Sequence, residues 1–392
     1  MKNQRNILSD CAQRVPSSGT LKMSTLANDL KAKGLQIIDL SIGEPNFNTP
    51  QEIIEAAYKA MNEGKTGYSS SKGILPLREK IAVAHTKETG VKIEPKENVI
   101  VTPGSKASLF TALVSLLNPK DNMIVIAPYW PSYEGIARFI GAKTKVIPSI
   151  DSNFSFPSEK VQEAIDKNTK ILLINSPGNP TGAIYDIKTL NFIKDLSVDN
   201  DLIIISDEIY KKIVFDGDYH SYLSISKSLD RTVIIDGFSK SHAMTGWRIG
   251  YTIANKEIIE AMNKVQQNIS TCVSTPTQYA ALKAFDLDEA TRMMVKEYKI
   301  RRDKALELIN NQCEYLSCSK PAGAFYLFAQ YKGKIPSSEL AIRLLEEKRV
   351  AITAGAEFGV KDNYIRISLA SEQNQILEGI RQINDFLKNL KK

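Results

Sequence analysis

The sequence predicts an α/β fold, in which helices cover both faces of a mostly parallel central sheet. Short runs of the sequence are continuously apolar, which is typical of strands that are buried on both faces. Longer segments with apolar residues at helical spacing alternate with these runs. The chain has 392 residues, of which 43% are hydrophobic and 24% are charged. This length is enough for one large domain or two linked domains, each with its own core.

The alternation of strands and helices runs through the middle of the chain. Strands are predicted at 98–101, 122–126, 143–147, 171–174, 202–206, 232–236 and 249–254. Helices are predicted at 105–117, 132–140, 158–167 and 186–198. Ser158 is expected to cap its helix, because a hydroxyl at that position can accept a hydrogen bond from the first turn.

The two ends of the chain differ from the middle. The first 45 residues contain a polar arm, a helical pattern near 25–33 and a strand at 37–41. The C-terminal part contains helical patterns at 288–310 and 373–390, with short strands at 325–328 and 365–368. We therefore expect a large domain at 46–284 and a smaller, discontinuous α+β domain made of 1–45 and 285–392.

Composition excludes several classes of protein. Lys and Arg number 51 against 44 Asp and Glu, a mild net charge of +7 without basic stripes, so no nucleic-acid partner is expected. No apolar run approaches the roughly 20 residues of a membrane span, and the N-terminus does not resemble a secretory signal. Four scattered Cys indicate reduced thiols and a cytoplasmic location. With only three His in addition, no metal site is expected.

The most informative segment is GFSKSHAMTGWRIG at residues 237–250. Lys240 lies in a loop of small residues between two predicted strands, and Arg248 follows eight residues later. A lysine held among small and apolar groups near another cation has a lowered pKa, so that it can form a Schiff base. An Arg and a nearby Ser hydroxyl can bind a phosphate. Taken alone, the segment also fits an ordinary surface loop.

Other strand ends favour the functional interpretation. Asn179 lies in an NPTG motif after one strand, and Asp207 ends the next strand, with Tyr210 three residues on. Ser105 opens a helix directly after a strand, where backbone N–H groups can bind an anion. Ligands of open α/β sheets bind at the carboxyl ends of strands. Together these groups are the set needed to hold pyridoxal phosphate.

From the motif SIGEP at residues 41–45 to Arg366, the sequence resembles the class I aminotransferases, which are fold-type I pyridoxal-phosphate enzymes. It is most similar to the bacterial aspartate and prephenate aminotransferase branch. The resemblance implies a homodimer with shared active sites. It also implies a ping-pong transfer of an amino group from aspartate, glutamate or an aromatic amino acid to a 2-oxo acid.

The resemblance assigns the cofactor ligands. Lys240 forms the Schiff base and then moves the proton, Asp207 pairs with the pyridine nitrogen, and Asn179 and Tyr210 bind the phenolic oxygen. The phosphate is expected to be bound by Ser105, Lys106, Ser239 and Arg248, and by Tyr68 of the other subunit, while Trp130 stacks on the ring.

The substrate ligands follow from the same resemblance. Arg366 is expected to bind the α-carboxylate together with the backbone N–H of Gly43. A distal carboxylate is assigned to Lys106, Ser18 and Thr20, and Trp130 and Asn179 are expected to contact the substrate as well.

The sequence also departs from the family pattern. Gly178 replaces an Asn before the NPTG motif, Ala354 replaces a Pro, and His242 lies two residues after Lys240. The same cofactor ligands serve elimination and oxidation in related enzymes. A lyase, or an amino-acid oxidase or hydroxylase, of the same fold therefore stays an alternative to transamination.

Overall fold

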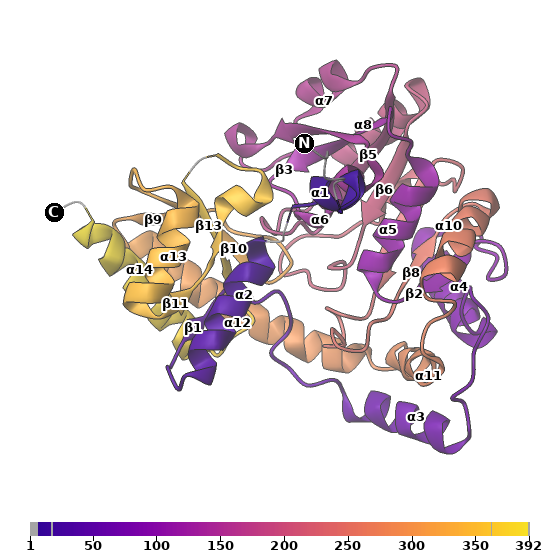
Figure 1. Cartoon of the computed structure of the whole chain (residues 1–392), viewed down its shortest axis with the longest axis horizontal. Coiled ribbons are helices and arrows are strands. Elements are labelled where there is room, and N and C mark those ends of the chain that lie inside the picture. The colour runs from indigo at the N-terminus through magenta and orange to yellow at the C-terminus, as the bar shows by residue number, and fades with distance from the viewer. Residues whose placement is uncertain (1–6, 17–18, 362, 391–392) are drawn as a thin grey trace, which may run out of the picture.

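The computed structural model describes residues 7–16, 19–361 and 363–390 of the chain. A seven-stranded sheet has the strand order β2-β8-β7-β6-β5-β3-β4. These strands are β2 (Val99–Thr102), β3 (Asn122–Ala127), β4 (Lys143–Pro148), β5 (Thr169–Asn175), β6 (Ile203–Asp207), β7 (Thr232–Gly237) and β8 (Gly250–Ile253). Neighbouring strands run parallel except at β8, which is antiparallel to both β2 and β7. The predicted mostly parallel sheet is therefore confirmed, with one strand reversed (Figure 1).

Helices cover both faces of this sheet. Their bounds are α3 (Gln51–Asn62), α4 (Leu75–Thr89), α5 (Ser105–Leu116), α6 (Ser132–Ile140), α7 (Ser158–Ala164), α8 (Ile187–Asp199), α9 (Tyr222–Ser226), α10 (Lys256–Ile269) and α11 (Thr275–Ala284). Ile100 and Val125 pack in one cluster with α5, α6 and α10. The adjacent residues Val101 and Ile124 pack in another cluster with α4, α8 and α11. This alternation explains why the strands are continuously apolar, since each of their faces has its own core.

Two predicted helix boundaries were wrong for identifiable reasons. The helix predicted from 186 begins one residue later, because the Asp186 side chain caps it and accepts the N–H of Thr189 at 2.8 Å. Ser158 does not cap α7, because Pro157 occupies the cap position and Ser158 is the first helical residue. That helix ends at Ala164, and Asp166 beyond it accepts the N–H of Asn168 at 2.8 Å in a turn that competes with the helix.

A second, four-stranded antiparallel sheet lies at the other end of the molecule, with the order β12-β13-β10-β9. Its strands are β9 (Leu316–Cys318), β10 (Tyr326–Tyr331), β12 (Thr353–Ala354) and β13 (Tyr364–Ser368). The helices around it are α12 (Asp288–Gln312), α13 (Ser337–Lys348) and α14 (Gln373–Asn389). The N-terminal strand β1 (Ile38–Asp39) pairs in parallel with β11 (Val350–Ala351), and α2 (Gly19–Ala32) packs against β11. Segments from both ends of the chain thus lie side by side (Figure 1).

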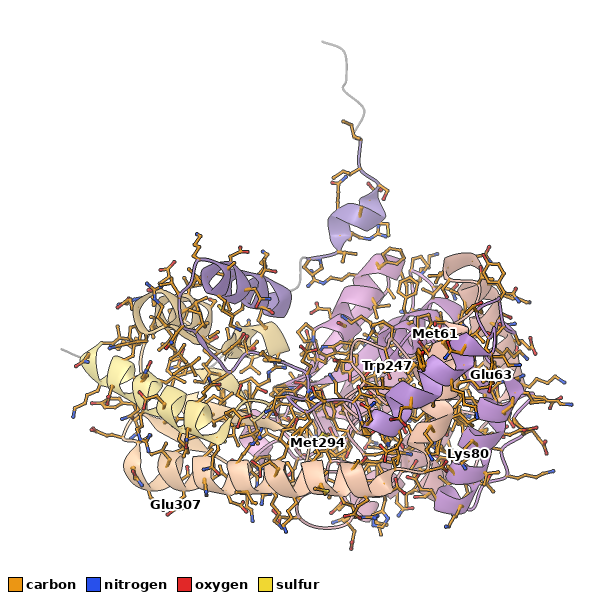
Figure 2. The ribbon with its side chains drawn as sticks, turned by 90° about the horizontal axis from the view of Figure 1, so that it is seen from below. Met61, Glu63, Lys80, Trp247, Met294 and Glu307 are labelled. Atoms are coloured by element: carbon orange, nitrogen blue, oxygen red, sulfur yellow. The ribbon has the colours of Figure 1, made fainter. Side chains whose placement is uncertain are left out.

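The long helix α12 links the two sheets. Figure 2 shows it along the lower edge of the molecule, with Glu307 toward one end and Met294 nearer the middle. At its first turns, the Thr291 hydroxyl donates to the backbone oxygen of Ser241 at 2.7 Å, which ties the helix to the loop after β7. Within the part of the chain that the structure describes, no helix has both the length and the apolar content that a membrane crossing requires.

The remaining short elements are α1 (Asp10–Arg14), which lies against α6, and the 3-10 turns at Ile150–Ser152 and Gly355–Phe358. The four cysteines are free thiols. The described residues contain no group of three or more His, Cys, Asp or Glu side chains arranged to hold a metal ion.

Candidate active site

A cavity of about 530 Å³ lies at the carboxyl ends of β5, β6 and β7, between the two sheets. It brings together most of the site residues predicted from the sequence. Those that line it are Gly43, Ser105, Lys106, Trp130, Asn179, Asp207, Tyr210, Ser239, Lys240, Arg248 and Arg366.

The other three predicted residues are Tyr68, Thr20 and Ser18. The side chain of Tyr68 is 90% exposed, and the residue does not line the cavity formed by its own chain. Thr20 lies in the first turn of α2, and Ser18 lies outside the described residues.

Lys240 follows β7, in the loop that leads to the reversed strand β8. Its ammonium donates to the backbone oxygen of Gly43 at 2.5 Å. Burial and the nearby Arg366 guanidinium lower the pKa of Lys240 to about 8. A substantial fraction of this amine is therefore neutral near pH 7.5, and a neutral amine can act as a nucleophile or accept a proton.

Asp207 is the last residue of β6, and it is buried. Its carboxylate accepts the Tyr133 hydroxyl at 2.7 Å and the N–H of Ile209 at 3.3 Å. Burial raises the pKa of Asp207 to about 6, although these two hydrogen bonds act in the opposite direction. A buried carboxylate with few partners is well suited to bind a protonated ring nitrogen.

Arg366 lies in β13 and is 3% exposed, so its guanidinium is buried. The guanidinium donates to the Asn179 amide oxygen at 3.1 Å and to the backbone oxygen of Ser41 at 2.7 Å. It stacks on the ring of Tyr326 at 4.4 Å. Among the described residues its Nε has no hydrogen-bond partner. A buried guanidinium with spare donors at a cavity wall can bind a carboxylate.

The N-terminus of α5 and Arg248 form an anion site. Gly104 has φ +86°, and a Cβ there would lie 2.5 Å from an Arg248 nitrogen. A Cβ on Gly250 would lie 2.5 Å from the backbone nitrogen of Ser105. Glycine is therefore required at both positions for these groups to come close. The donors meet where a phosphate would be held by a helix N-terminus and an arginine.

The residues present fit pyridoxal phosphate. The anion site provides donors for a phosphate, Asp207 provides a buried acceptor for the ring nitrogen, and Lys240 provides an amine between them. Trp130 and Asn179 line the same cavity and supply an aromatic face and an amide.

Two residues of this site were missed in the sequence. Tyr133 hydrogen-bonds Asp207, and it lies three residues after Trp130, a helical spacing that could have indicated it. The hydroxyl of Tyr326 lies 2.9 Å from that of Tyr210, and its ring supports Arg366. No sequence pattern pointed to Tyr326, because the two sheets have to meet before it faces Tyr210.

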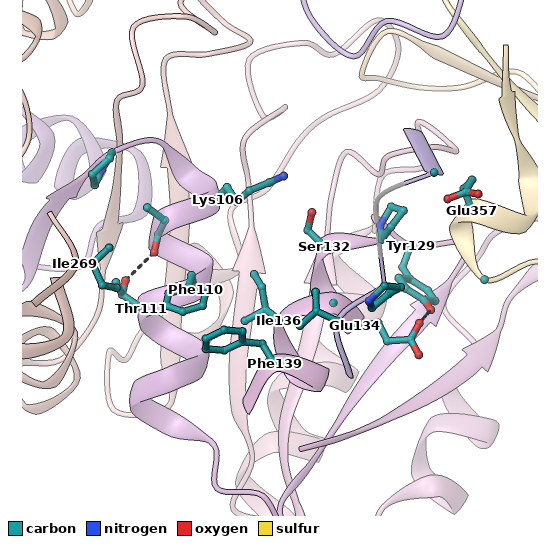
Figure 3. A pocket seen from close by; sticks show the side chains of 18 of the residues that line it. Lys106, Phe110, Thr111, Tyr129, Ser132, Glu134, Ile136, Phe139, Ile269 and Glu357 are labelled. Carbon is teal, nitrogen blue, oxygen red and sulfur yellow. Dashed lines mark hydrogen bonds between the residues drawn. The ribbon is translucent and has the colours of Figure 1, made fainter. Parts of the chain in front are cut away.

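A second cavity of about 770 Å³ adjoins the first and shares Lys106, Pro131, Ser132 and Arg248 with it. Figure 3 shows its apolar floor, where Phe110 and Phe139 lie close together. Lys106 projects at its edge with the amine 4.9 Å from the centre of the Trp130 ring. Burial and the charge of Arg248 lower the pKa of Lys106.

Comparisons with known proteins agree with this geometry. The family model of the class I and II aminotransferases matches residues 36–383. A (5-formylfuran-3-yl)methyl phosphate transaminase of Methanocaldococcus jannaschii is 41% identical over 365 residues, covering 92% of this chain and 94% of the relative. An aspartate aminotransferase of Thermotoga maritima is 37% identical over 374 residues, covering 95% of this chain and 97% of the relative.

Solved structures give the same result. A Thermotoga maritima aspartate aminotransferase superposes with a TM-score of 0.92 at 36% identity, over 97% of this chain and 100% of that one. A Thermus thermophilus aspartate aminotransferase with maleate has a TM-score of 0.89 at 34% identity, over 97% of this chain and 99% of that one. These matches confirm the fold, the cofactor and the enzyme class expected from the sequence. The chain belongs to the class I and II aminotransferases and is a pyridoxal-phosphate-dependent enzyme that transfers amino groups between amino acids and 2-oxo acids.

Proposed function

We propose that the enzyme transfers the amino group of aspartate or glutamate, or of an aromatic amino acid, to a 2-oxo acid in a ping-pong cycle. The observation that carries this proposal is the buried Arg366, whose Nε has no hydrogen-bond partner in the described parts of the chain, at the cavity that also holds the Lys240 amine and Lys106. Relatives named as aspartate and aromatic-amino-acid aminotransferases support the substrate class.

Arg366 would bind the α-carboxylate of the substrate. Its guanidinium is held by Ser41, Asn179 and the Tyr326 ring, so little rotamer entropy is lost on binding. The backbone of Gly43 lies next to it, since a Cβ on Gly43 would be 4.0 Å from an Arg366 nitrogen. A carboxylate fixed in this way orients the substrate Cα–H bond toward Lys240.

Lys240 would carry the cofactor and move the proton to and from the substrate Cα. Its lowered pKa of about 8 suits a group that must both accept and return a proton near neutral pH. When bound, pyridoxal phosphate supplies an electron sink for the electrons of the broken Cα–H bond. Asp207 would keep the ring nitrogen protonated, and Tyr210 and Asn179 would donate to the ring oxygen.

Ser105, Ser239, Arg248 and the first backbone amides of α5, including that of Lys106, would hold the cofactor phosphate. Trp130 would stack on the ring, and Tyr68 would reach the phosphate of the partner subunit. The side chain of Lys106, with Ser18 and Thr20, would bind a distal carboxylate. The amine of Lys106 at the cavity edge supports this role.

We also propose a homodimer with shared active sites. Three large apolar side chains of α3, namely Ile54, Tyr58 and Met61, are exposed at helical spacing on one face. Tyr68 is exposed near them in the sequence, and the apolar second cavity opens beside the active site. A second copy of the chain would cover these surfaces.

Complementation tests the dimer. Lys240→Ala and Tyr68→Ala subunits, unfolded together and refolded, form hybrids in which one site is complete. The mixture should regain about a quarter of wild-type activity, because half of randomly formed dimers carry one complete site. An unmixed pair of samples is the control, and a mixture no more active than its components would contradict shared sites.

The organisation into a large domain at 46–284 and a small domain made of 1–45 and 285–392 is likewise our proposal. Separate apolar clusters beside the two sheets support it, as does the pairing of β1 with β11. The free cysteines support a cytoplasmic location.

Half-reactions test the substrate proposal. The holoenzyme is mixed with aspartate, glutamate, tyrosine or alanine, and the visible absorbance of the cofactor is followed by stopped flow. We expect conversion by aspartate and glutamate at least about tenfold faster than by alanine, since only the former reach Lys106. If none of the acidic or aromatic amino acids converts the cofactor, the proposed substrate class is wrong. The phosphate-bearing substrate named for the Methanocaldococcus jannaschii relative makes a phosphorylated aldehyde a useful additional acceptor.

A further inference from the structure

A cluster of polar and charged side chains from β7, β8, α4 and the segment after β6 lies beneath the active site, and it is buried except at Glu88, which is exposed. It consists of Asp236, Lys211, Glu88, His85 and Tyr251, and we refer to it as the buried ion cluster. Lys211 is 9% exposed and Asp236 is 6% exposed. None of these side chains lines the active-site cavity, so the roles proposed above do not account for them.

Lys211 is the centre of this cluster. Its ammonium lies 2.8 Å from Glu88, 3.2 Å from Asp236 and 3.3 Å from the Nε2 atom of His85. The ammonium donates a hydrogen bond to Glu88 and forms an ion pair with Asp236. Burial acts to lower the pKa of Lys211, but the charges of Asp236, Glu88 and Glu208 outweigh it and raise the pKa. Lys211 is therefore a permanent buried cation.

Burial and the charge of Lys211 lower the pKa of His85 far below its usual value. His85 is thus neutral, and its Nε2 atom lies 3.0 Å from the hydroxyl of Tyr251. The hydroxyl of Tyr251 donates to Asp236 at 2.7 Å. Both residues come from elements that flank the site, α4 beside β2 and the reversed strand β8 (Figure 1). The charge of Asp236 is consequently compensated from several directions.

The two ends of the Lys211–Asp236 ion pair lie next to active-site residues in the chain. Lys211 directly follows Tyr210 and is four residues after Asp207, while Asp236 is four residues before Lys240. The other carboxylate oxygen of Asp236 accepts the N–H of Gly237 at 2.6 Å, at the start of the loop that carries Lys240. The backbone oxygen of Asp236 accepts the Ser105 hydroxyl at 3.0 Å. The pair therefore joins the segment after β6 to the loop after β7 and to the anion site.

The charge of Asp236 also acts on Asp207 in the cavity. Burial, and to a smaller extent the charge of Asp236, raises the pKa of Asp207. The other titratable or charged groups that act on Asp207 are Tyr133, Tyr210 and Lys240. Two further groups lie around Lys211. The charge of Lys212 acts on His85, and Tyr219 hydrogen-bonds Glu208. Without Lys211, the Asp236 charge would lose its ammonium partner and act more strongly on Asp207.

We propose that Lys211 is a positioning residue for this reaction: its ammonium neutralises Asp236 beneath the site and ties the strand end that carries Asp207 to the loop that carries Lys240. This inference rests on the proposed roles of Asp207 and Lys240. It assigns to Lys211 a function without any contact with substrate or cofactor.

The experiment measures the affinity of the apoenzyme for pyridoxal phosphate against pH, by quenching of tryptophan fluorescence. Binding should weaken on acidification as Asp207 takes up a proton, with a wild-type midpoint near pH 6. In Lys211→Met the midpoint should rise by about one unit, a tenfold change in proton affinity at Asp207. Lys211→Arg should stay close to wild type because it keeps the cation. Lys145→Met is the matched control. Lys145 lies on the distant edge strand β4, is 29% exposed and pairs with Asp166.

Asp236→Asn should shift the pH midpoint of binding in the opposite direction. It removes the charge that raises the pKa of Asp207, so the midpoint should fall below the wild-type value. The double variant Lys211→Met/Asp236→Asn should return close to wild type, and it keeps the proposal testable if Lys211→Met alone does not fold. The proposal is overturned if the pH midpoint of pyridoxal-phosphate binding is the same in all these variants. It is also overturned if Lys145→Met shifts the midpoint as much as Lys211→Met does. Failure of the wild-type apoenzyme to bind pyridoxal phosphate would instead contradict the proposed cofactor site.

Discussion

The cofactor side and the substrate side of the active site are built differently. On the cofactor side, Ser105, Asp207 and Lys240 each follow or end a strand of the same sheet. On the substrate side, Arg366 belongs to the small sheet and bonds to Ser41 and Asn179, which are 325 and 187 residues away in the sequence. The cofactor side therefore depends on one rigid framework, whereas the substrate side depends on how two sheets meet.

This difference predicts that cofactor-side variants change the reaction of every substrate alike, while substrate-side variants separate one substrate from another. The largest effect should come from Lys240→Ala. Its loss removes the amine that we propose carries the cofactor and moves the proton, so turnover of all amino acids should fall at least about 10³-fold. Circular dichroism should show an intact fold. Transamination retained in this variant would remove Lys240 from the mechanism.

A second cofactor-side prediction concerns pH and stability. Asp207 has its pKa raised to about 6 from the ordinary 3.8 when folded. The protonated form is thus favoured by the folded state, and this contributes about 3 kcal/mol below pH 4 that is lost as the pH rises through 6. Urea denaturation of the apoenzyme, compared with Asp207→Asn between pH 4 and 7, measures this difference. A stability difference that does not vary with pH would show that Asp207 titrates normally.

On the substrate side, Arg366→Lys loses the guanidinium fork that we propose binds the α-carboxylate. We expect KM for every amino acid to rise about 30-fold, while affinity for pyridoxal phosphate stays within about twofold. Arg301→Lys is the control, because Arg301 is a buried arginine of α12 that does not line the cavity. It should lower stability and leave KM unchanged. Unaltered steady-state kinetics in Arg366→Lys would exclude the carboxylate role.

The smallest effect on activity is expected for Lys106→Ala, and this variant should distinguish acidic from aromatic substrates most clearly. Lys106→Ala removes the side-chain amine at the cavity edge but keeps the backbone N–H that we propose binds phosphate. We expect kcat/KM for aspartate to fall about tenfold relative to that for tyrosine. The ratio of the two values is the measurement, since it cancels any change in the cofactor. An equal loss for both amino acids would place Lys106 on the cofactor side instead.

The same contrast explains what the sequence could predict. Asn179, Asp207, Lys240 and Arg248 follow or end apolar strands, so the pattern of the strands predicted which edge they share. The strands of the large sheet were predicted to within about two residues, because all of them except the edge strand β4 are buried on both faces. Tyr133 was missed, although it lies one helical turn beyond Trp130.

Other features could not be read from the sequence. Tyr326 and the backbone oxygen of Ser41 come to Arg366 only through the packing of the two sheets, which no local pattern encodes. Helix α4 was not predicted, since its apolar residues do not form a single stripe and it buries Arg78 and His85 as well. The buried ion cluster was missed for a similar reason, because its charged residues resemble surface residues until the fold encloses them.

The reversed strand β8 has a consequence for the order of folding. Because β8 runs back along β7, Lys240 and Arg248 lie on one loop between neighbouring antiparallel strands. Pairing of such near neighbours costs little chain entropy, whereas each parallel pair requires a crossover helix to form first. We expect the lysine and the arginine to reach their relative positions early, as one hairpin, and the remaining ligands to assemble around them. The spacing between the cofactor's two anchoring residues would then be set before the enzyme has a cavity.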